Sequence, residues 1–136
     1  MATIKSYTDI NQSEKLAEIL PIESADMYYE KGIGNNYRID FGNYADISIS
    51  KNLLHIDAIP CWSLAALLGV LPFHLIINNQ RYAFSMHKGV DKDGETYMIR
   101  YNIFNTDICL YKTEYYNNPI DACVAMVEKL HELKLL

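Results

Sequence analysis

The hydrophobic pattern of the chain centres on an almost uncharged stretch, residues 59–72, which contains the single tryptophan, Trp62. Ser63 has the chemistry of a helix N-cap, and Pro72 keeps the residue before it out of the helical region. A short helix is therefore predicted over residues 63–71. Apolar residues occupy nearly every position of this segment, which is typical of a helix that is buried on all sides. We expect a central helix with the rest of the chain around it.

Two further helices are predicted near the ends of the chain. Asp9 or Asn11 can cap a helix over residues 11–20, which Pro21 ends. Asn118 can cap a helix over residues 119–133, with proline at its first position and an acid in its first turn. Apolar residues recur along this last helix at helical spacing; they are Ile120, Cys123, Met126, Val127, Leu130 and Leu133.

Alternating apolar and polar residues predict four strands within residues 73–113. For example, Tyr82, Phe84 and Met86 alternate with Arg81, Ser85 and His87, and Tyr97, Ile99 and Tyr101 alternate with Thr96 and Arg100. Short turn sequences separate the strands, which indicates an antiparallel meander. One face should be packed, and the other should be rich in tyrosine and polar residues.

The segment from residue 22 to residue 58 has a weaker pattern. Ser24 can cap a helical turn that continues through Tyr29. Alternation predicts a short strand at residues 37–41 and another at residues 47–50. Together the elements predict an α+β fold in one domain, residues 1–136, with helices 11–20, 63–71 and 119–133 against one face of the meander.

Composition and charge limit the classes of function. The formal net charge is −5 at pH 7, and the basic residues are not clustered, which argues against nucleic-acid binding. The chain opens with no signal-peptide pattern and has no apolar run of about 18 residues, so we expect a cytoplasmic protein without membrane contact. The odd number of cysteines, Cys61, Cys109 and Cys123, indicates free thiols in a reducing compartment.

One group of residues could support thiol chemistry. His55 and Asp57 precede Cys61, which itself lies just before the predicted central helix. An imidazole and a helix N-terminus both favour the thiolate form of cysteine, so Cys61 could act as a nucleophile with His55 as its base and Asp57 as the orienting group. The alternative is that Cys61 packs beside Trp62 as a small apolar side chain.

Metal and cofactor sites have little support in the sequence. Asp91–Glu95 resembles the opening of a calcium loop, but the required glycine and glutamate are replaced by Thr96 and Asn102, so a hairpin turn is favoured. The histidines are too scattered for a zinc motif, and no phosphate-binding glycine loop is present. We expect no metal and no cofactor.

Tyrosines supply the other candidate binding residues. Tyr82, Tyr97, Tyr101 and Tyr111 lie on the predicted strands and could form a binding surface on the outer face of the sheet. Stacking of nucleic-acid bases on these rings would need accompanying basic residues, which the strands lack. Cross-strand aromatic pairing within the sheet also explains them.

Three segments, residues 16–27, 59–72 and 118–133, together resemble a group of small uncharacterised proteins of gut bacteria and their prophages or other mobile elements. The shared features are helix caps, proline stops and apolar stripes, and no activity is attached to that group. The resemblance therefore implies a genomic setting and no catalytic residue.

These observations favour a non-enzymatic accessory protein of a mobile element that acts through contacts with a protein partner. A homo-oligomer is also compatible with them. The alternative is a small-molecule binder or a thiol-dependent enzyme that uses Cys61, His55 and Asp57.

Overall fold

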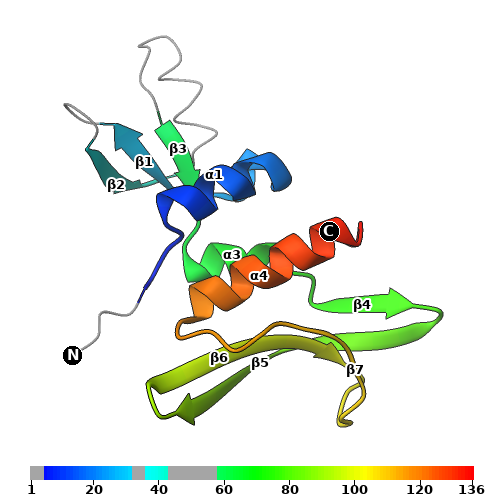
Figure 1. Ribbon diagram of the computed structural model, residues 1–136. Helices are drawn as coiled ribbons and strands as arrows, with labels where there is room; N and C mark the ends of the chain where they lie inside the picture. The colour runs from blue at the N-terminus through cyan, green and yellow to red at the C-terminus, as the bar shows by residue number, and fades with distance from the viewer. Residues whose placement is uncertain (1–4, 32–35, 43–57) are drawn as a thin grey trace. The chain divides into compact units, whose positions relative to one another are not determined.

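The computed structural model describes residues 5–31, 36–42 and 58–136, and Figure 1 shows its helices and strands. The fold belongs to the α+β class, as predicted, and contains two antiparallel sheets. The chain divides into two compact units: Ser6–Val70, here the N-terminal unit, and Leu71–Leu136 together with Lys5, here the C-terminal unit. The single domain over residues 1–136 stays a prediction, and the strand expected at residues 47–50 lies outside the described residues.

The N-terminal unit opens with helix α1, Ile10–Ile19. Asp9 caps it: its carboxylate accepts a hydrogen bond from the backbone N–H of Gln12 at 2.8 Å, and the Gln12 side chain accepts one from the backbone N–H of Asp9 at 3.1 Å. This reciprocal capping box satisfies N–H groups that the first helical turn cannot. Leu20 is extended because Pro21 follows it. The helix predicted over residues 11–20 is confirmed.

A three-stranded antiparallel sheet follows, in the order β2-β1-β3. Strand β1 is Met27–Lys31, β2 is Tyr37–Phe41 and β3 is Ala58–Cys61. The strand predicted at residues 37–41 is confirmed, whereas the helical turn expected from Ser24 through Tyr29 is wrong.

The error at Ser24–Tyr29 has a physical cause. Helical geometry is limited to a short 3-10 turn, η1, at Ile22–Ser24. The tyrosines that follow have high β propensity, and Tyr29 pairs with Ile39 on one side and Ile59 on the other. Pairing on both sides makes β1 the central strand, and this outweighs the local capping signal of Ser24.

Strand β3 was not predicted. It contains Pro60, which lacks the backbone N–H that a position inside a sheet ladder requires. Among the described strands β3 lies at the edge of the sheet and pairs with β1, and Pro60 lies opposite Tyr28. An edge strand leaves one row of its backbone groups unpaired, so a proline is tolerated there.

The core of this sheet is formed by Met27, Tyr29 and Cys61. Helix α1 lies against β3 and adds to this core (Figure 1). The partly buried side chains packed against it are Tyr7, Ile10, Ile39 and Ile59. Trp62, the residue after β3, is fully buried as predicted, and its indole N–H donates to Ser24 Oγ at 2.9 Å.

Helix α3 spans Leu64–Val70, and Ser63 caps it as predicted, accepting a hydrogen bond from the backbone N–H of Ala66 at 3.2 Å. The expectation that this helix is buried on all sides is wrong. Leu67 is fully buried, but Leu68 is 40% exposed. The exposed side also carries Gly69, and alanine and glycine residues offer little apolar area whose burial would be favourable.

The C-terminal unit contains the predicted four-stranded antiparallel meander, in the order β4-β5-β6-β7. Its strands are β4 (His74–Ile77), β5 (Gln80–Asp91), β6 (Gly94–Asn102) and β7 (Cys109–Lys112). Asn78 and Asn79 join β4 to β5 with φ values of 52° and 65°, which is the conformation of a type I′ hairpin turn. Gly94, with φ of 123°, begins β6 after the β5–β6 turn.

Helix α4, Pro119–Glu132, lies against β6. As predicted, Asn118 caps the helix, accepting a hydrogen bond from the backbone N–H of Asp121 at 2.8 Å. The apolar stripe is buried as predicted, namely Ile120, Cys123, Met126, Val127 and Leu130. Leu133 is the exception at 42% exposed, because the helix ends before it.

The meander has two different faces. The Lys129 ammonium of α4 lies 5.7 Å from the centroid of the Tyr111 ring, which identifies the face that packs against α4. Tyr101 lies opposite Tyr111 and belongs to the same face. Ser85 and Arg100 lie opposite each other and belong to the other face, which is called the polar face below.

Candidate functional site

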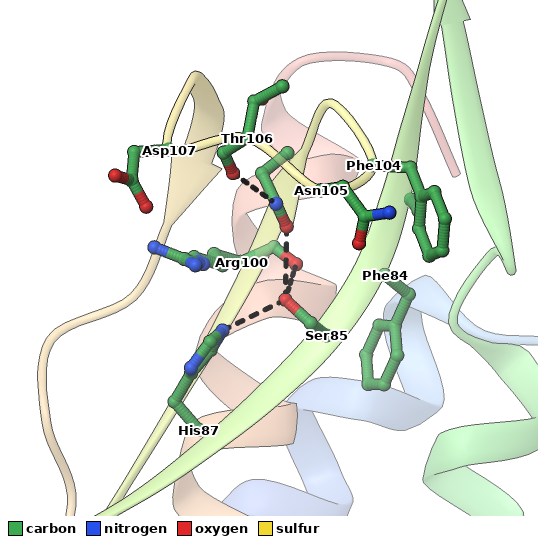
Figure 2. Close-up of a pocket in the computed structure, with 10 residues that line it drawn as sticks. Phe84, Ser85, His87, Arg100, Phe104, Asn105, Thr106 and Asp107 are labelled. Carbon is green, nitrogen blue, oxygen red and sulfur yellow. Dashed lines mark hydrogen bonds between the residues drawn. The ribbon is translucent and has the colours of Figure 1, made fainter.

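A hollow of about 430 Å³ lies on the polar face of the meander (Figure 2). Strands β5 and β6 contribute its floor, and the β6–β7 loop, residues 103–108, forms a wall. None of its lining residues is buried, so the hollow is open to solvent. The lining residues are Ala83, Phe84, Ser85, His87, Arg100, Asn102, Phe104, Asn105, Thr106 and Asp107.

A hydrogen-bond network joins the floor of the hollow to its wall. The Asn102 side-chain amide donates to the backbone carbonyls of Ile103 at 3.2 Å and Thr106 at 3.1 Å. Carbonyl oxygens only accept, so these contacts fix which side-chain atom of Asn102 is nitrogen and which is oxygen. The Asn102 oxygen then faces Ser85 Oγ at a distance of 3.1 Å.

Ser85 links this network to His87. Its Oγ lies 3.1 Å from His87 Nε2, and its single hydroxyl hydrogen has the Asn102 side-chain oxygen at 3.1 Å and the Arg100 carbonyl at 3.5 Å as further acceptors. The direction of the hydrogen bond between Ser85 and His87 follows the tautomer of the imidazole.

Arg100 supplies the positive charge of the hollow. Its Nε is buried and has no hydrogen-bond partner among the residues that the structure describes. Asp107 lines the same hollow (Figure 2), but no ion pair joins it to Arg100. Burial, followed by the charge of Arg100, lowers the pKa of His87 below its ordinary value, so His87 is neutral at pH 7.

The hollow therefore combines a cation, a neutral imidazole and side chains already hydrogen-bonded to one another. A guanidinium supplies hydrogen-bond donors, so this arrangement suits binding of an acceptor group. No acidic side chain is hydrogen-bonded to His87 in the described part of the chain.

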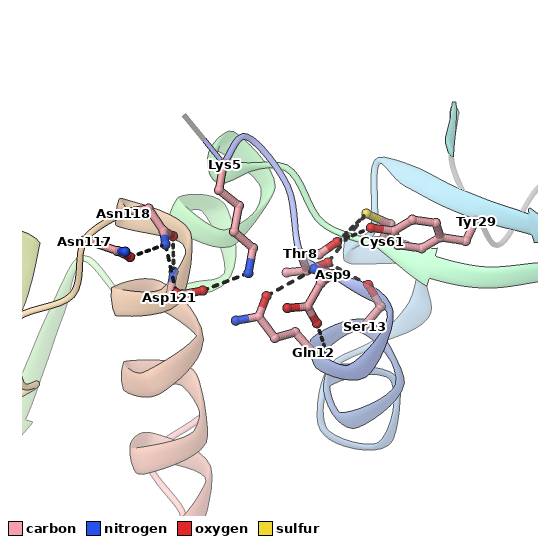
Figure 3. Close-up of polar contacts among 10 residues, drawn as sticks. All are labelled: Lys5, Thr8, Asp9, Gln12, Ser13, Tyr29, Cys61, Asn117, Asn118 and Asp121. Carbon is pink, nitrogen blue, oxygen red and sulfur yellow. Dashed lines mark hydrogen bonds and ion pairs between the residues drawn. The ribbon is translucent and has the colours of Figure 1, made fainter. Parts of the chain in front are cut away.

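The structure describes only Cys61 of the three residues in the predicted thiol site. Cys61 is fully buried in the N-terminal unit, and Figure 3 shows it beside Thr8, Ser13 and Tyr29. Burial raises the pKa of the Cys61 thiol, which favours the uncharged and unreactive form. His55 and Asp57 lie outside the described residues. What the structure shows of Cys61 agrees with the packing alternative.

Thr8 is the polar centre around this cysteine. It is fully buried, and its hydroxyl lies 2.7 Å from Ser13 Oγ and accepts from the Trp62 backbone N–H at 3.2 Å. The Tyr29 hydroxyl donates to the Thr8 carbonyl at 2.6 Å. These contacts tie the start of α1 to the end of β3, so the cluster has a structural explanation.

A second polar group, also shown in Figure 3, lies at the start of α4 in the C-terminal unit. The Asp121 carboxylate accepts hydrogen bonds from Lys5 Nζ at 2.9 Å and from Asn118 Nδ2 at 2.8 Å. A negative charge in the first helical turn is favourable, and the pair joins Lys5 to the helix.

The other two cysteines differ in exposure. Cys123 is fully buried in α4, and burial raises the pKa of its thiol to about 12. Cys109 is only partly buried, at the start of β7, and its thiol donates to the Tyr111 carbonyl at 3.3 Å. All three are free thiols.

The predicted tyrosine surface requires a correction at Tyr101. This side chain is fully buried on the α4 face, and its hydroxyl donates to the Pro72 carbonyl at 2.6 Å. Tyr82, Tyr97 and Tyr111 are partly buried. The register puts all four on the side of the sheet that α4 covers, because they alternate with the residues of the polar face. Binding by Tyr82, Tyr97 and Tyr111 stays a prediction.

Other kinds of site can be compared with the structure. Asp91 and Asp93 lie in the β5–β6 turn, where the Asp93 N–H donates to the Asp91 carboxylate at 2.8 Å, which confirms the hairpin turn. Within residues 5–31, 36–42 and 58–136, no three metal-ligating side chains cluster. No helix in this part of the chain is long and apolar enough to cross a membrane.

The residues of the hollow were not singled out as a site from the sequence. Ser85, His87 and Arg100 were recognised only as the polar positions of two alternating strands. The hairpin register between β5 and β6 is what brings them together, with Ser85 opposite Arg100. The signal that could have identified them was the coincidence of a histidine, a serine and an arginine on the same face of one hairpin.

Comparisons with known proteins add no assignment: no family model, no curated protein and no solved structure matches the chain. The resemblance to small proteins of gut bacteria and their mobile elements therefore stays a prediction.

Proposed function

We propose that the protein is a non-enzymatic binding protein that contacts a protein partner through the β6–β7 loop and the adjoining hollow. The observation that carries this proposal is the pair of exposed apolar side chains on that loop. Phe104 is 76% exposed and Ile108 is 59% exposed, and Phe104 lines the hollow together with Arg100. Aromatic residues and arginine are enriched where proteins bind each other.

The conformation of the loop supports this role. The Ile103 N–H donates to the Ile108 carbonyl at 2.9 Å, and the Thr106 hydroxyl donates to the Ile103 carbonyl at 2.7 Å. Asn102 adds two further hydrogen bonds to this loop. A loop held in this way presents Phe104 without first losing conformational entropy, which favours binding.

The role as an accessory protein of a mobile element, in the cytoplasm, is part of the same proposal and rests on the resemblance and the sequence pattern. The surface described here does not depend on that setting.

The proposal can be tested by affinity capture with three forms of the protein as bait. Phe104→Ser removes the exposed ring next to the hollow. Val90→Ser is the matched control, because Val90 is 81% exposed and lies near the β5–β6 turn. All three should have the same circular dichroism spectrum. We expect wild type and Val90→Ser to retain the same host protein from lysate.

The Phe104→Ser bait should retain about tenfold less of that protein or worse, since aromatic anchors of interfaces are worth about 2 kcal/mol or more. Equal retention by Phe104→Ser, or a wild-type bait that captures nothing specific, would contradict the proposed function.

A further inference from the structure

We propose that a second copy of this chain pairs with the outer edge of β4, so that two meanders join into one antiparallel sheet. Strand β4 pairs with β5 on one side and has no neighbour on its other side among the described strands (Figure 1). No residue of β4 lines the hollow. The inference therefore goes beyond the proposed function and concerns a different surface of the C-terminal unit.

The turn between β4 and β5 determines which backbone groups of β4 point outward. Asn78 and Asn79 form its two-residue loop, so the residues on either side of the loop, Ile77 and Gln80, form a hydrogen-bonded pair. Such pairs alternate with non-hydrogen-bonded pairs along an antiparallel ladder. Every second residue of β4, counted from Ile77, therefore directs its backbone N–H and C=O toward β5, and the residues between them direct theirs outward.

His74 and Ile76 are the residues of β4 whose backbone groups point outward. As the alternation requires, the Phe84 N–H of β5 donates to the carbonyl of Phe73, one residue before His74, at 3.1 Å. Outside the ladder, no backbone hydrogen bond among the described residues involves His74 or Ile76. Each of them can therefore offer one N–H and one C=O to a further strand.

Strand β4 also lacks the features that commonly protect a sheet edge, which are charged side chains and bulges. Residues 73–80 contain no Asp, Glu, Lys or Arg. Phe73 is 86% exposed and Ile76 is 61% exposed. At the opposite edge of the meander, β7 has a register shift against β6, and the Lys112 carbonyl accepts a hydrogen bond from Lys129 Nζ at 3.4 Å. The β4 edge is therefore better suited to accept another strand.

A second copy is the occupant that this edge fits, because β4 is its own complement. If two copies run antiparallel about a two-fold axis at Leu75, His74 of each copy lies opposite Ile76 of the other, and their outward N–H and C=O groups pair. Two chains that each carry a net charge of −5 repel each other, and this register brings together segments without charged residues. A two-fold contact closes on itself, so association stops at the dimer.

The test is analytical ultracentrifugation of the complete protein over a range of concentrations. Ile76→Lys adds an ammonium group at the pairing edge. Val90→Lys is the matched control, because Val90 is 81% exposed and lies on β5 near the β5–β6 turn. The contact is short, so we expect wild type and Val90→Lys to dimerise with a dissociation constant on the order of 100 µM. Ile76→Lys should dimerise at least about tenfold more weakly, because each dimer loses two apolar contacts and gains two charges at the edge.

Amide hydrogen exchange of wild type, followed by NMR, locates the contact without any substitution. The His74 and Ile76 amides should exchange about tenfold more slowly well above the dissociation constant than well below it, because only the dimer provides their acceptors. The Gln80 amide is the internal control, since it already pairs with Ile77 within each copy, and its exchange should change little.

The inference is overturned if wild type stays monomeric up to about 1 mM, roughly ten times the expected dissociation constant. It is also overturned if Ile76→Lys dimerises as well as wild type, or if the His74 and Ile76 amides exchange at the same rate at every concentration. Species larger than a dimer would contradict the two-fold contact. A monomeric protein whose captured host partner is lost in Ile76→Lys would assign this edge to that partner instead of a second copy.

Discussion

At the scale of single residues, the chemistry of the hollow follows from one side-chain orientation. Two backbone carbonyls determine how the Asn102 amide lies, and its oxygen then faces the Ser85 hydroxyl, which also contacts His87. Sequence patterns predicted the helix caps Ser63 and Asn118, because a cap acts within a few residues. They could not predict the hollow, because its hydrogen bonds join residues from two strands and a loop.

The polar network around Thr8 should contribute measurably to the stability of the N-terminal unit. In Thr8→Val the shape is retained, but the Trp62 backbone N–H and the Ser13 hydroxyl lose a buried partner. We expect the free energy of unfolding to fall by about 1–3 kcal/mol. Trp62 is the single tryptophan and lies in this unit, so urea unfolding followed by its fluorescence measures the change.

Thr96→Val is the control for that experiment, because Thr96 is partly exposed on β6 and its hydroxyl has no recorded hydrogen bond among the described residues. It should leave the Trp62 transition almost unchanged. Equal unfolding midpoints for Thr8→Val and wild type would show that the network contributes little.

His87 should make stability depend on pH in a defined direction. An unfolded histidine has a pKa of about 6.5, and burial with the Arg100 charge lowers the pKa of His87 in the folded state. Below about pH 6.5 the unfolded chain therefore takes up a proton first, so the free energy of unfolding decreases as the pH falls through this range. His87→Gln should lack this part of the pH dependence.

NMR titration of the histidines measures the pKa of His87 in the folded protein directly. In Arg100→Gln the pKa of His87 should rise but stay below 6.5, because burial remains. Titration of His87 at or above pH 6.5 in wild type would contradict the argument.

At the scale of elements, prediction succeeded where short signals acted alone. Proline stops and caps located α1, α3 and α4, and alternation located the meander strands. It failed at β1 and β3, where pairing between distant strands outweighs local preference. The capping signal at Ser24 made Tyr29 appear helical, and no strand was predicted at residues 58–61. Only the position of each strand in the sheet, central or edge, resolves these two cases.

Replacement by alanine should change the stability of the protein in opposite directions at two of its glycines. Gly94 has φ of 123° at the β5–β6 turn, a conformation that side chains rarely adopt. Gly94→Ala should therefore lower stability by about 1–3 kcal/mol. Gly69 lies in α3 with open space around its missing Cβ, so Gly69→Ala should raise stability by about 0.5 kcal/mol. Thermal unfolding followed by circular dichroism tests both, and a stabilising Gly94→Ala would contradict the turn geometry.

At the scale of the whole molecule, charge provides the clearest expectation. The net charge of −5 repels a phosphate backbone, and the described lysines include Lys5, Lys88 and Lys129, which are engaged with Asp121, Glu95 and the Lys112 carbonyl. The charge excess could be read from composition. The division into two compact units could not, because it depends on which distant segments make contact.

We therefore expect no specific binding to a single-stranded oligonucleotide. Filter binding at low salt, where electrostatic attraction is strongest, should show no retention beyond that of a blank filter. Retention that falls steeply as salt is added would contradict this and would reveal a basic surface.

The unequal burial of the three cysteines has a practical consequence. A maleimide dye applied to the native protein should attach at Cys109, while Cys61 and Cys123 are shielded. Cys109 is the register partner of Asn102, which lines the hollow, so the dye would be located beside it. An environment-sensitive fluorophore could then report occupancy of the hollow in the natural sequence, without any engineered attachment point.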